Sequence, residues 1–292
     1  MQNLWAPELH QWNGRWYVYV AAELPGQGNK SHRMYVIGGP LVSQNPLNGP
    51  WELLGRIQGL PESQWQIDGT IIWLQRVPYL VYSGWPLGRS GDSELIQELY
   101  IVQMKSPTEA MSQPVRISTP EFSWEKSGNH CINEGPQLLS APDGSWVGLT
   151  YSCGASWNAD YKICTLRWTG GNPLLPLSWQ KSQKPLLRTP PNGKGPYGPG
   201  HGCFVPMGNE LVCVFHAIDD LAIGWESRRA RIQRLIFQDG LPYMGEYIGR
   251  EVAGIGDFFA KWPTPGNWEA NHKKSYFQML FGCIAARRAR SA

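Results

Sequence analysis

The chain has 292 residues, a formal net charge of +3, and an unusual richness in Trp (15), Gly (33) and Pro (24). Its apolar runs are short and are broken by Gly, Pro and Asn, which predicts an all-β fold with little helix. No apolar stretch is long enough for a membrane-spanning helix. The basic excess is concentrated in residues 256–292, so the nearly neutral body offers no face for nucleic acid.

Polar residues recur at a regular interval, each ahead of an apolar strand. Glu8, Asp68, Glu134 and His201 are separated by 60, 66 and 67 residues. A repeat of about 65 residues, each unit able to form a four-stranded antiparallel sheet, is typical of a β-propeller. The first strand of each unit would line the central channel, so these four side chains are expected to converge on one axis.

In chain order the units are expected at residues 4–60, 65–120, 121–189 and 198–255. Their strands are predicted at 15–22, 32–37, 51–54, 71–74, 78–83, 99–104, 115–118, 146–151, 161–168, 179–182, 211–217 and 229–237. Residues 1–255 then form the propeller domain, and residues 256–292 form a basic tail outside the fold.

Two carboxylates on the expected axis suggest chemistry. Glu134 lies in an apolar, Gly- and Pro-rich segment, where burial would raise its pKa and make it a proton donor. A protonated acid, the carboxylate of Asp68 and a Trp-rich channel are typical of glycoside hydrolysis. The alternative is that both acids only tie down inner strands. His201 would bind a cation directly or through water, orient the acid, or merely fill the channel.

Aromatic side chains are candidates for contact with a sugar ring. Trp5, Trp65, Trp85 and Trp157 could each offer a flat face. Most of the 15 Trp must belong to the core, and Trp5 is the best candidate because it lies beside an axial carboxylate.

The six cysteines form no metal-site pattern, since no pair has the C-x-x-C spacing. Cys213 is expected in the core. Cys153 and Cys164 are candidates for a pair, although spacing alone does not fix connectivity.

Eight segments together resemble glycoside hydrolase family 43, and in particular its exo-acting α-L-arabinofuranosidases. In family order and spacing they are LWAPELH (4–10), GRWYVY (14–19), HRMYV (32–36), IDGT (67–70), YSGW (82–85), NEGP (133–136), YS (151–152) and GPGH (198–201). The resemblance extends from residue 4 to about residue 250. It implies a five-bladed β-propeller that cleaves its glycosidic bond with inversion.

The resemblance also implies residue roles. Glu134 takes the position of the general acid, and Asp68 that of the carboxylate that orients the sugar and tunes the acid. His201 takes the axial position near a bound cation such as calcium, held through water, with no cofactor required. Trp5 matches the aromatic wall of the sugar pocket, and Arg229 matches a substrate-binding arginine of the last blade.

One family position has no counterpart in this sequence. The general base is an Asp in the first blade, which the repeat would place 60 or more residues before Glu8. We therefore expect about four blades, with the first blade largely absent, and severe loss of activity in the chain as written. The alternatives are a catalytically inactive carbohydrate-binding propeller, or an endo-arabinanase or β-xylosidase of the same fold.

The resemblance further implies a polysaccharide or oligosaccharide substrate, a monomer and an extracellular location. No signal peptide is visible after Met1.

Overall fold

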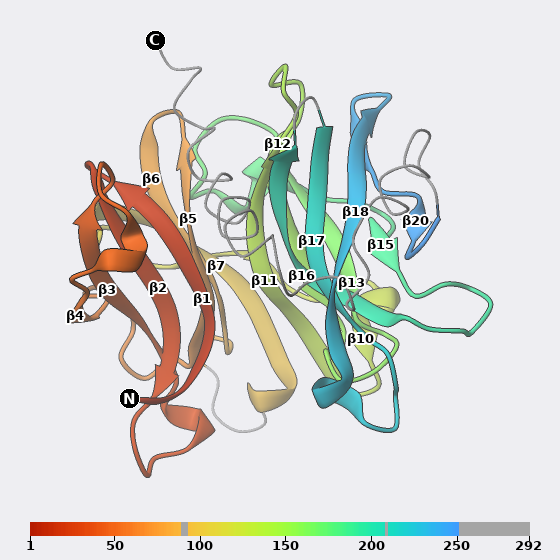
Figure 1. The fold of residues 1–292 in the computed structure, drawn as a ribbon, viewed down its shortest axis with the longest axis horizontal. Helices are drawn as coiled ribbons and strands as arrows, with labels where there is room; N and C mark the ends of the chain where they lie inside the picture. Colours follow the sequence, from red (N-terminus) through yellow and green to blue (C-terminus); the bar gives the residue numbers. More distant parts are fainter. Residues whose placement is uncertain (89–92, 208–209, 251–292) are drawn as a thin grey trace, which may run out of the picture.

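The computed structural model describes residues 1–88, 93–207 and 210–250 (Figure 1). Its strands there form two four-stranded sheets and one twelve-stranded sheet. A short parallel pairing joins two antiparallel blades within the twelve-stranded sheet, so we distinguish four blades. Blade 1 comprises β1 (Gln2–Trp12), β2 (Arg15–Glu23), β3 (Arg33–Leu41) and β4 (Glu52–Arg56). Blade 2 comprises β5 (Gln66–Leu74), β6 (Val77–Gly84), β7 (Ile96–Ser106), β8 (Glu109–Ala110) and β9 (Val115–Ser118). The all-β propeller prediction is confirmed.

The remaining two blades follow the same plan. Blade 3 comprises β10 (Lys126–Ser127), β11 (His130–Ser140), β12 (Val147–Cys153), β13 (Lys162–Trp168), β14 (Trp179–Lys181) and β15 (Leu187–Arg188). Blade 4 comprises β16 (Tyr197–Met207), β17 (Glu210–Ile218), β18 (Arg228–Gln238) and β19 (Leu241–Tyr243), and β20 (Glu246–Tyr247) returns to pair with β15. Short 3-10 helices lie at Asn29–Ser31, Pro46–Asn48, Ser93–Leu95, Ser123–Glu125, Pro176–Ser178 and Gly224–Ser227.

The innermost strands β1, β5, β11 and β16 lie around one axis, because β5 contacts both β1 and β11, and β16 contacts β11. Each of them carries a β-bulge in which two residues oppose one on the next strand, beginning at residue 6, 68, 135 or 201, and β1 and β16 carry a second bulge nearer their N-terminal ends. The first bulge residue has positive φ in every case: Ala6 (43°), Asp68 (55°), Gly135 (57°) and His201 (48°). The repeat is therefore a repeated backbone kink as well as a repeated sheet.

The bulges correct the alignment of the repeat. Asp68 and His201 are bulge residues, whereas Glu134 lies directly before its bulge and Glu8 lies directly after its own. In addition, the segments expected only to lead into strands are themselves the inner strands. Pro7 and Pro136 are the reason that β1 and β11 were not predicted as strands. A proline lacks the N–H of a regular ladder, but it is tolerated at a bulge.

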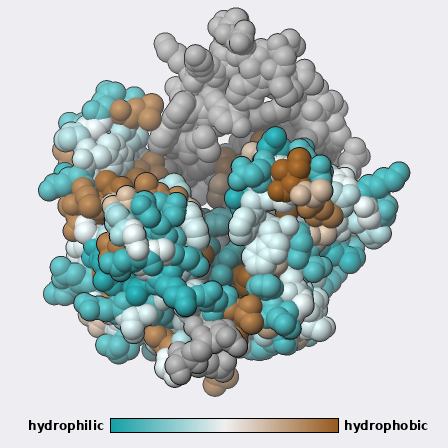
Figure 2. All heavy atoms as spheres, turned by 90° about the horizontal axis from the view of Figure 1, so that it is seen from below, coloured by the Kyte–Doolittle hydropathy of each residue, from teal (hydrophilic) through white to brown (hydrophobic). Residues whose placement is uncertain are grey.

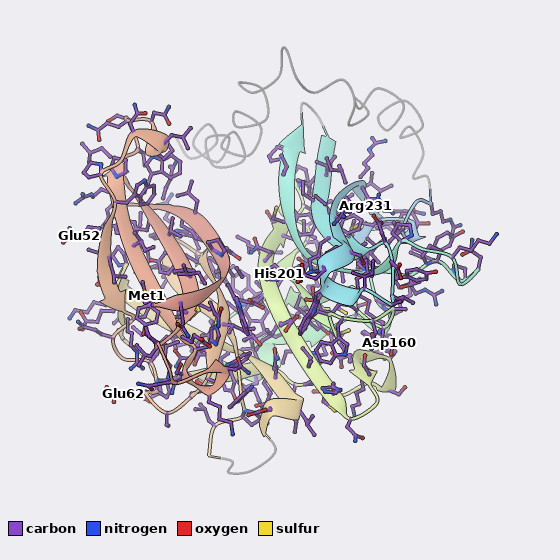
Figure 3. The ribbon with its side chains drawn as sticks, turned by 60° about the horizontal axis from the view of Figure 1, so that its bottom comes forward. Met1, Glu52, Glu62, Asp160, His201 and Arg231 are labelled. Carbon is purple, nitrogen blue, oxygen red and sulfur yellow. The ribbon has the colours of Figure 1, made fainter. Side chains whose placement is uncertain are left out.

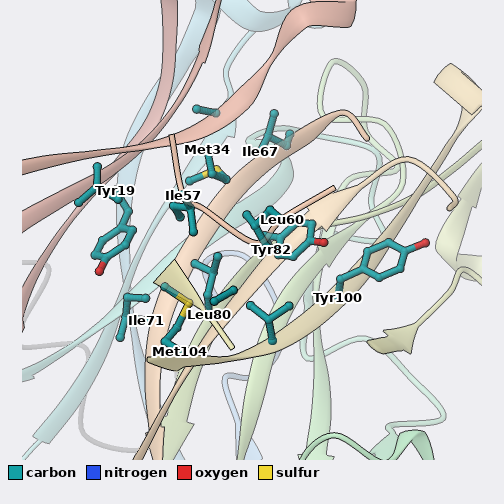
Figure 4. Close-up of a cluster of buried hydrophobic side chains, with 14 of the residues drawn as sticks. Tyr19, Met34, Ile57, Leu60, Ile67, Ile71, Leu80, Tyr82, Tyr100 and Met104 are labelled. Atoms are coloured by element: carbon teal, nitrogen blue, oxygen red, sulfur yellow. The ribbon is translucent and has the colours of Figure 1, made fainter. Parts of the chain in front are cut away.

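Apolar side chains fill the spaces between neighbouring blades. Tyr19 and Met34 of blade 1 pack in one cluster with Leu80 and Tyr82 of blade 2 (Figure 4). A second cluster joins blades 2 and 3, and a third joins blades 3 and 4. The blades are thus held side by side around the axis by apolar burial.

Apolar residues also reach the surface, in separate patches between polar ones (Figure 2). None of the helices in the described ranges is long and apolar enough to cross a membrane. The expected basic tail at residues 256–292 lies outside the described residues.

One cysteine expectation is confirmed, and the candidate pair is found as two free thiols. Cys213 is fully buried in the cluster between blades 3 and 4, as predicted. Cys153 and Cys164 lie on adjacent strands as buried free thiols, with their Sγ atoms 2.8 Å apart.

Candidate active site

Three of the predicted site residues meet where β5, β11 and β16 approach one another. Asp68 comes from β5, Glu134 from β11 and His201 from β16. His201, on the innermost strand of blade 4, lies near the middle of the molecule (Figure 3). The expected convergence on the axis is therefore present in the fold.

Glu134 is enclosed and poised to carry a proton. Its side chain is buried, with 8% of the residue exposed, and its Oε1 accepts a hydrogen bond from the Tyr161 hydroxyl at 2.6 Å. Burial, followed by the negative charge of Asp68, raises the pKa of Glu134 to about 7, against the opposing effects of Tyr161 and His201. A carboxyl group with such a pKa can donate a proton near neutrality.

Asp68 is held by the backbone beside that acid. Its Oδ2 accepts a hydrogen bond from the Gly135 N–H at 3.0 Å and lies 4.0 Å from Nδ1 of His201. Burial raises the pKa of Asp68, whereas His201 and the Gly135 N–H favour the charged form. Because Asp68 has these stabilising partners, we assign the negative charge of the pair to Asp68 and the proton to Glu134.

The left-handed backbone at Gly135 is needed for close approach. Its φ of 57° is unfavourable for residues with a Cβ, and an added Cβ would lie 3.2 Å from Cγ of His201. The backbone N–H of His201 in turn donates to Oγ of Ser152 at 2.7 Å. The bulges of β11 and β16 therefore fit against each other and fix the imidazole beside the two acids.

Tyr161, which sequence reasoning placed only at a strand start, is a residue of the site. Its ring stacks on His216 with centroids 5.6 Å apart, and Gly200 leaves room for it, since a Cβ there would lie 1.8 Å from Cε1 of Tyr161. Burial, with a contribution from Arg228, lowers the pKa of His216 to about 3, so this support is neutral. No motif singles out Tyr161, and its stacking on His216 joins blades 3 and 4.

A buried polar network lies behind Glu134. Lys181 on β14 donates from Nζ to both carboxylate oxygens of Glu125, at 2.7 and 2.9 Å. Asn133, adjacent to Glu134, donates to Glu125 Oε1 at 3.1 Å. Despite burial, Lys181 holds the pKa of Glu125 below its usual range. Through Asn133, this ion pair helps to hold β11, the strand that carries Glu134, in place.

Glu8 lies at the edge of the cluster, and its carboxylate already has partners. Oε2 lies 3.0 Å from Nε2 of His10, and Oε1 accepts from the side-chain amide of Gln137 on β11. The contact with Gln137 ties the first blade to the third, so Glu8 anchors the inner strands.

Of the candidate aromatic platforms, Trp5 has an open face. It occupies the position of β1 that corresponds to Glu134 in β11, one residue before the bulge, and 41% of it is exposed. Its ring stacks on His32, with centroids 3.9 Å apart. Trp65 is buried in the core and stacks on Trp85, so it cannot serve as a platform.

The arginine whose charge acts on the acid is Arg228, the neighbour of the predicted Arg229. The charge of Arg228 contributes to lowering the pKa of Glu134. Arg229 Nη1 donates instead to the carbonyl oxygens of Glu226 and Arg228. Neighbouring strand residues face opposite sides, and sequence alone did not show which of two consecutive arginines faces the site.

His201 is the residue beside which the sequence predicts a cation held through water. Within the described ranges, no three His, Cys, Asp or Glu side chains gather in a way that could hold a metal ion.

Comparison with known proteins identifies the class of this site. The profile of Glycosyl hydrolases family 43 matches residues 1–242, and the chain belongs to that family. An extracellular exo-α-(1→5)-L-arabinofuranosidase of Streptomyces avermitilis is 33% identical over 266 residues, which cover 87% of this chain and 52% of that protein. An α-L-arabinofuranosidase 43 of Humicola insolens is 32% identical, over 83% of this chain and 50% of its own length. The chain spans about half the length of these relatives.

Solved structures agree with this assignment. The crystal structure of an α-L-arabinofuranosidase from Lactobacillus brevis superposes with a TM-score of 0.72 at 27% identity, covering 86% of this chain and 78% of that one. A thermostable family-43 glycoside hydrolase gives a TM-score of 0.69 at 26% identity, covering 84% and 75%.

Proposed function

We propose that the protein is a glycosidase that removes terminal α-L-arabinofuranosyl residues from arabinan or arabinose-substituted polysaccharide, with Glu134 as general acid. The observation that carries this proposal is the buried Glu134 carboxyl, whose pKa is raised to about 7 and which lies beside Asp68 and His201. Relatives named as α-L-arabinofuranosidases support the choice of sugar.

In the proposed reaction Glu134 donates its proton to the glycosidic oxygen as the bond to the anomeric carbon breaks. Asp68 keeps a negative charge next to the acid and orients the sugar. Trp5 supplies an apolar wall. Inversion also needs a base that activates water, and among the described carboxylates around Glu134 we assign this role neither to Asp68 nor to Glu8, because each already has its own partners.

The chain is proposed to act outside the cell as a monomer, since the substrate is a polymer and related proteins are named extracellular. Any axial cation is proposed to bind beside His201 through water, without a role in proton transfer.

The test is cleavage of α-1,5-arabinobiose, with and without added azide. Azide is a nucleophile that needs no deprotonation, so it replaces base-activated water in an inverting site. We expect arabinosyl azide of inverted configuration, and no product from a β-xyloside. Cleavage of the xyloside without cleavage of arabinobiose would contradict the proposal, as would arabinobiose cleavage that persists in Glu134→Gln.

A further inference from the structure

An exposed apolar cleft lies on the loops beside the candidate acid. It has a volume of about 430 Å³ and is formed by the loop 154–161 between β12 and β13 and the loop 219–227 between β17 and β18. Its lining residues are Trp157, Leu221, Ala222, Ile223, Gly224 and Trp225. Leu221, Ile223 and Trp225 are 42%, 57% and 50% exposed. Such a cluster of large exposed apolar side chains marks a binding surface, and the volume suits a small ligand.

The two tryptophan rings of this cleft are fixed although they are exposed. Nε1 of Trp225 donates to Oγ of Ser156 at 3.0 Å, and the rings of Trp157 and Trp225 meet edge to face at 83°, with centroids 5.4 Å apart. His130 packs edge-on against the Trp157 ring at 4.9 Å. A ligand that binds here does not have to order the rings, which reduces the entropic cost of binding.

The loop that carries Trp225 is also preformed. Asp220 and Ser227 close it: the Ser227 hydroxyl donates to the Asp220 carbonyl at 2.8 Å, and the Asp220 N–H donates to Ser227 Oγ at 3.1 Å. Oδ1 of Asp220 accepts from the Ala222 N–H at 2.9 Å. The hydrogen bonds of Asp220 and Ser227 therefore fix the loop 219–227 in the conformation that exposes its apolar side chains.

The cleft is linked to the site of Glu134 by shared segments, because the loop 154–161 ends at Tyr161, whose hydroxyl donates to Glu134. Arg228, whose charge acts on Glu134, donates from Nε to the Trp225 carbonyl at 3.3 Å. His130 begins the same strand as Glu134 and contacts Trp157. Because the acid protonates the leaving oxygen, the sugar beyond the cleaved bond must lie next to the acid.

We propose that the Trp157–Trp225 cleft is the subsite for the leaving-group sugar of an arabino-oligosaccharide, with the furanose ring packed on Trp225 and flanked by Trp157. This rests on the proposed function. An aromatic face offers the apolar area that the C–H groups of a sugar need.

The experiment compares the affinities of arabinose and α-1,5-arabinotriose by calorimetry, on the full chain carrying Glu134→Gln to prevent turnover. We expect the trisaccharide to bind about 3- to 10-fold more tightly than arabinose, the range of one aromatic contact. Trp225→Ala and Trp157→Ala should remove this preference and leave the affinity for arabinose unchanged. Trp225→Phe, which keeps an aromatic face, should retain most of it.

Trp51→Ala is the matched control, because Trp51 is a partly exposed tryptophan of blade 1, just before β4. It should leave the preference intact. Equal affinity for both sugars in the parent chain would overturn the subsite and leave the proposed function standing, whereas absence of binding by either sugar would overturn both. Loss of arabinose affinity in the Trp225 and Trp157 variants, equal to the loss for the trisaccharide, would also overturn the subsite.

Discussion

Trp5 in β1 and Glu134 in β11 occupy the same place in two blades, one residue before a bulge whose first residue has positive φ. Their surroundings differ. Trp5 has an open face and rests on His32, whereas Glu134 is covered by Tyr161 and lies close to Asp68 and His201.

The repeated bulge therefore sets only the direction in which a side chain points. Its burial and its pKa depend on the residues packed around it, including those of the neighbouring blade. Blade 4 contributes His201, and the Tyr161 ring packs between Gly200 and His216 of that blade. An exposed carboxyl at the position of Trp5 would keep an ordinary pKa, because burial is the main cause of the shift at Glu134. The predictions below remove one part of this enclosure at a time.

The largest effect is expected from Glu134→Gln, which removes the proton and keeps the shape. We expect cleavage of arabinobiose to slow by about 10²- to 10⁴-fold, the usual contribution of a general acid. Cleavage of p-nitrophenyl α-L-arabinofuranoside should slow far less, because nitrophenolate is stable as an anion and needs little protonation. The measurement is the ratio of kcat/KM for the two substrates, with and without azide, in the parent and the variant. Equal losses on both substrates would show that Glu134 does not act as the acid.

Gly200→Ala should disturb the packing around Glu134 through a steric clash with Tyr161. The new Cβ would lie 1.8 Å from Cε1 of Tyr161, so either the ring or β16 must move, at an expected cost of about 3 kcal/mol. Chemical denaturation measures the loss in the free energy of unfolding. The control is Gly144→Ala in the β11–β12 turn, where φ is 74° and nothing lies within 4 Å; it should cost only the backbone strain, about 1 kcal/mol. A Gly200 variant no less stable than the control would mean that Tyr161 does not need this space.

Much of the fold and part of this site could be predicted from the sequence. The strand segments, the repeat and the meeting of Asp68, Glu134 and His201 all follow from local composition and spacing. Spacing could not show the bulges, however, because an inserted residue changes which side chains are equivalent without changing the apolar pattern. This is why Glu8 was aligned with Asp68 although it lies directly after its own bulge.

Contacts between blades were beyond prediction for a different reason. Tyr161 and His216 are 55 positions apart in the sequence, and neither belongs to a motif. The choice between Arg228 and Arg229 depends on the exact register of β18 against β17. Such facts depend on how blades pack, not on the sequence around each residue.

The pH dependence of stability tests the burial of Glu134 directly. Its pKa is about 7 in the fold against an ordinary value of 4.5, so the folded state binds this proton more tightly than the unfolded state. The contribution is fully present below about pH 4.5 and is lost as pH rises through 7. Relative to the parent, Glu134→Gln should therefore gain up to about 3 kcal/mol on going from pH 5 to pH 8. Unfolding in urea at both pH values measures this difference.

Glu125→Gln should change the pH dependence of the free energy of unfolding in the opposite direction. The pKa of Glu125 is held low by Lys181 in spite of burial, so its charged form stabilises the fold above the ordinary carboxyl pKa and that contribution is lost in acid. This variant should lose stability at pH 8, where the buried Lys181 is left without its partner. The same pH response in both variants would show that the enclosure of Glu134 has no special electrostatic effect.

Tyr161→Phe tests the smallest part of the enclosure, a single hydrogen bond. The ring and its stacking on His216 remain, but the anionic form of Glu134 loses a donor that lies 2.6 Å away. The pKa of Glu134 should rise above its value of about 7, by less than about one unit, since a hydrogen bond to a charged group contributes little more than the free energy of one such unit. The alkaline limb of the pH–rate profile for arabinobiose should move upward by the same amount. Tyr151→Phe is the matched control, because Tyr151 also donates to a buried glutamate of blade 3, Glu125, at 2.9 Å, and its loss should leave the limb in place. A purely structural role for Tyr161 would lower the rate at every pH without moving the limb, so the position of the limb separates an effect on the proton of Glu134 from an effect on the fold.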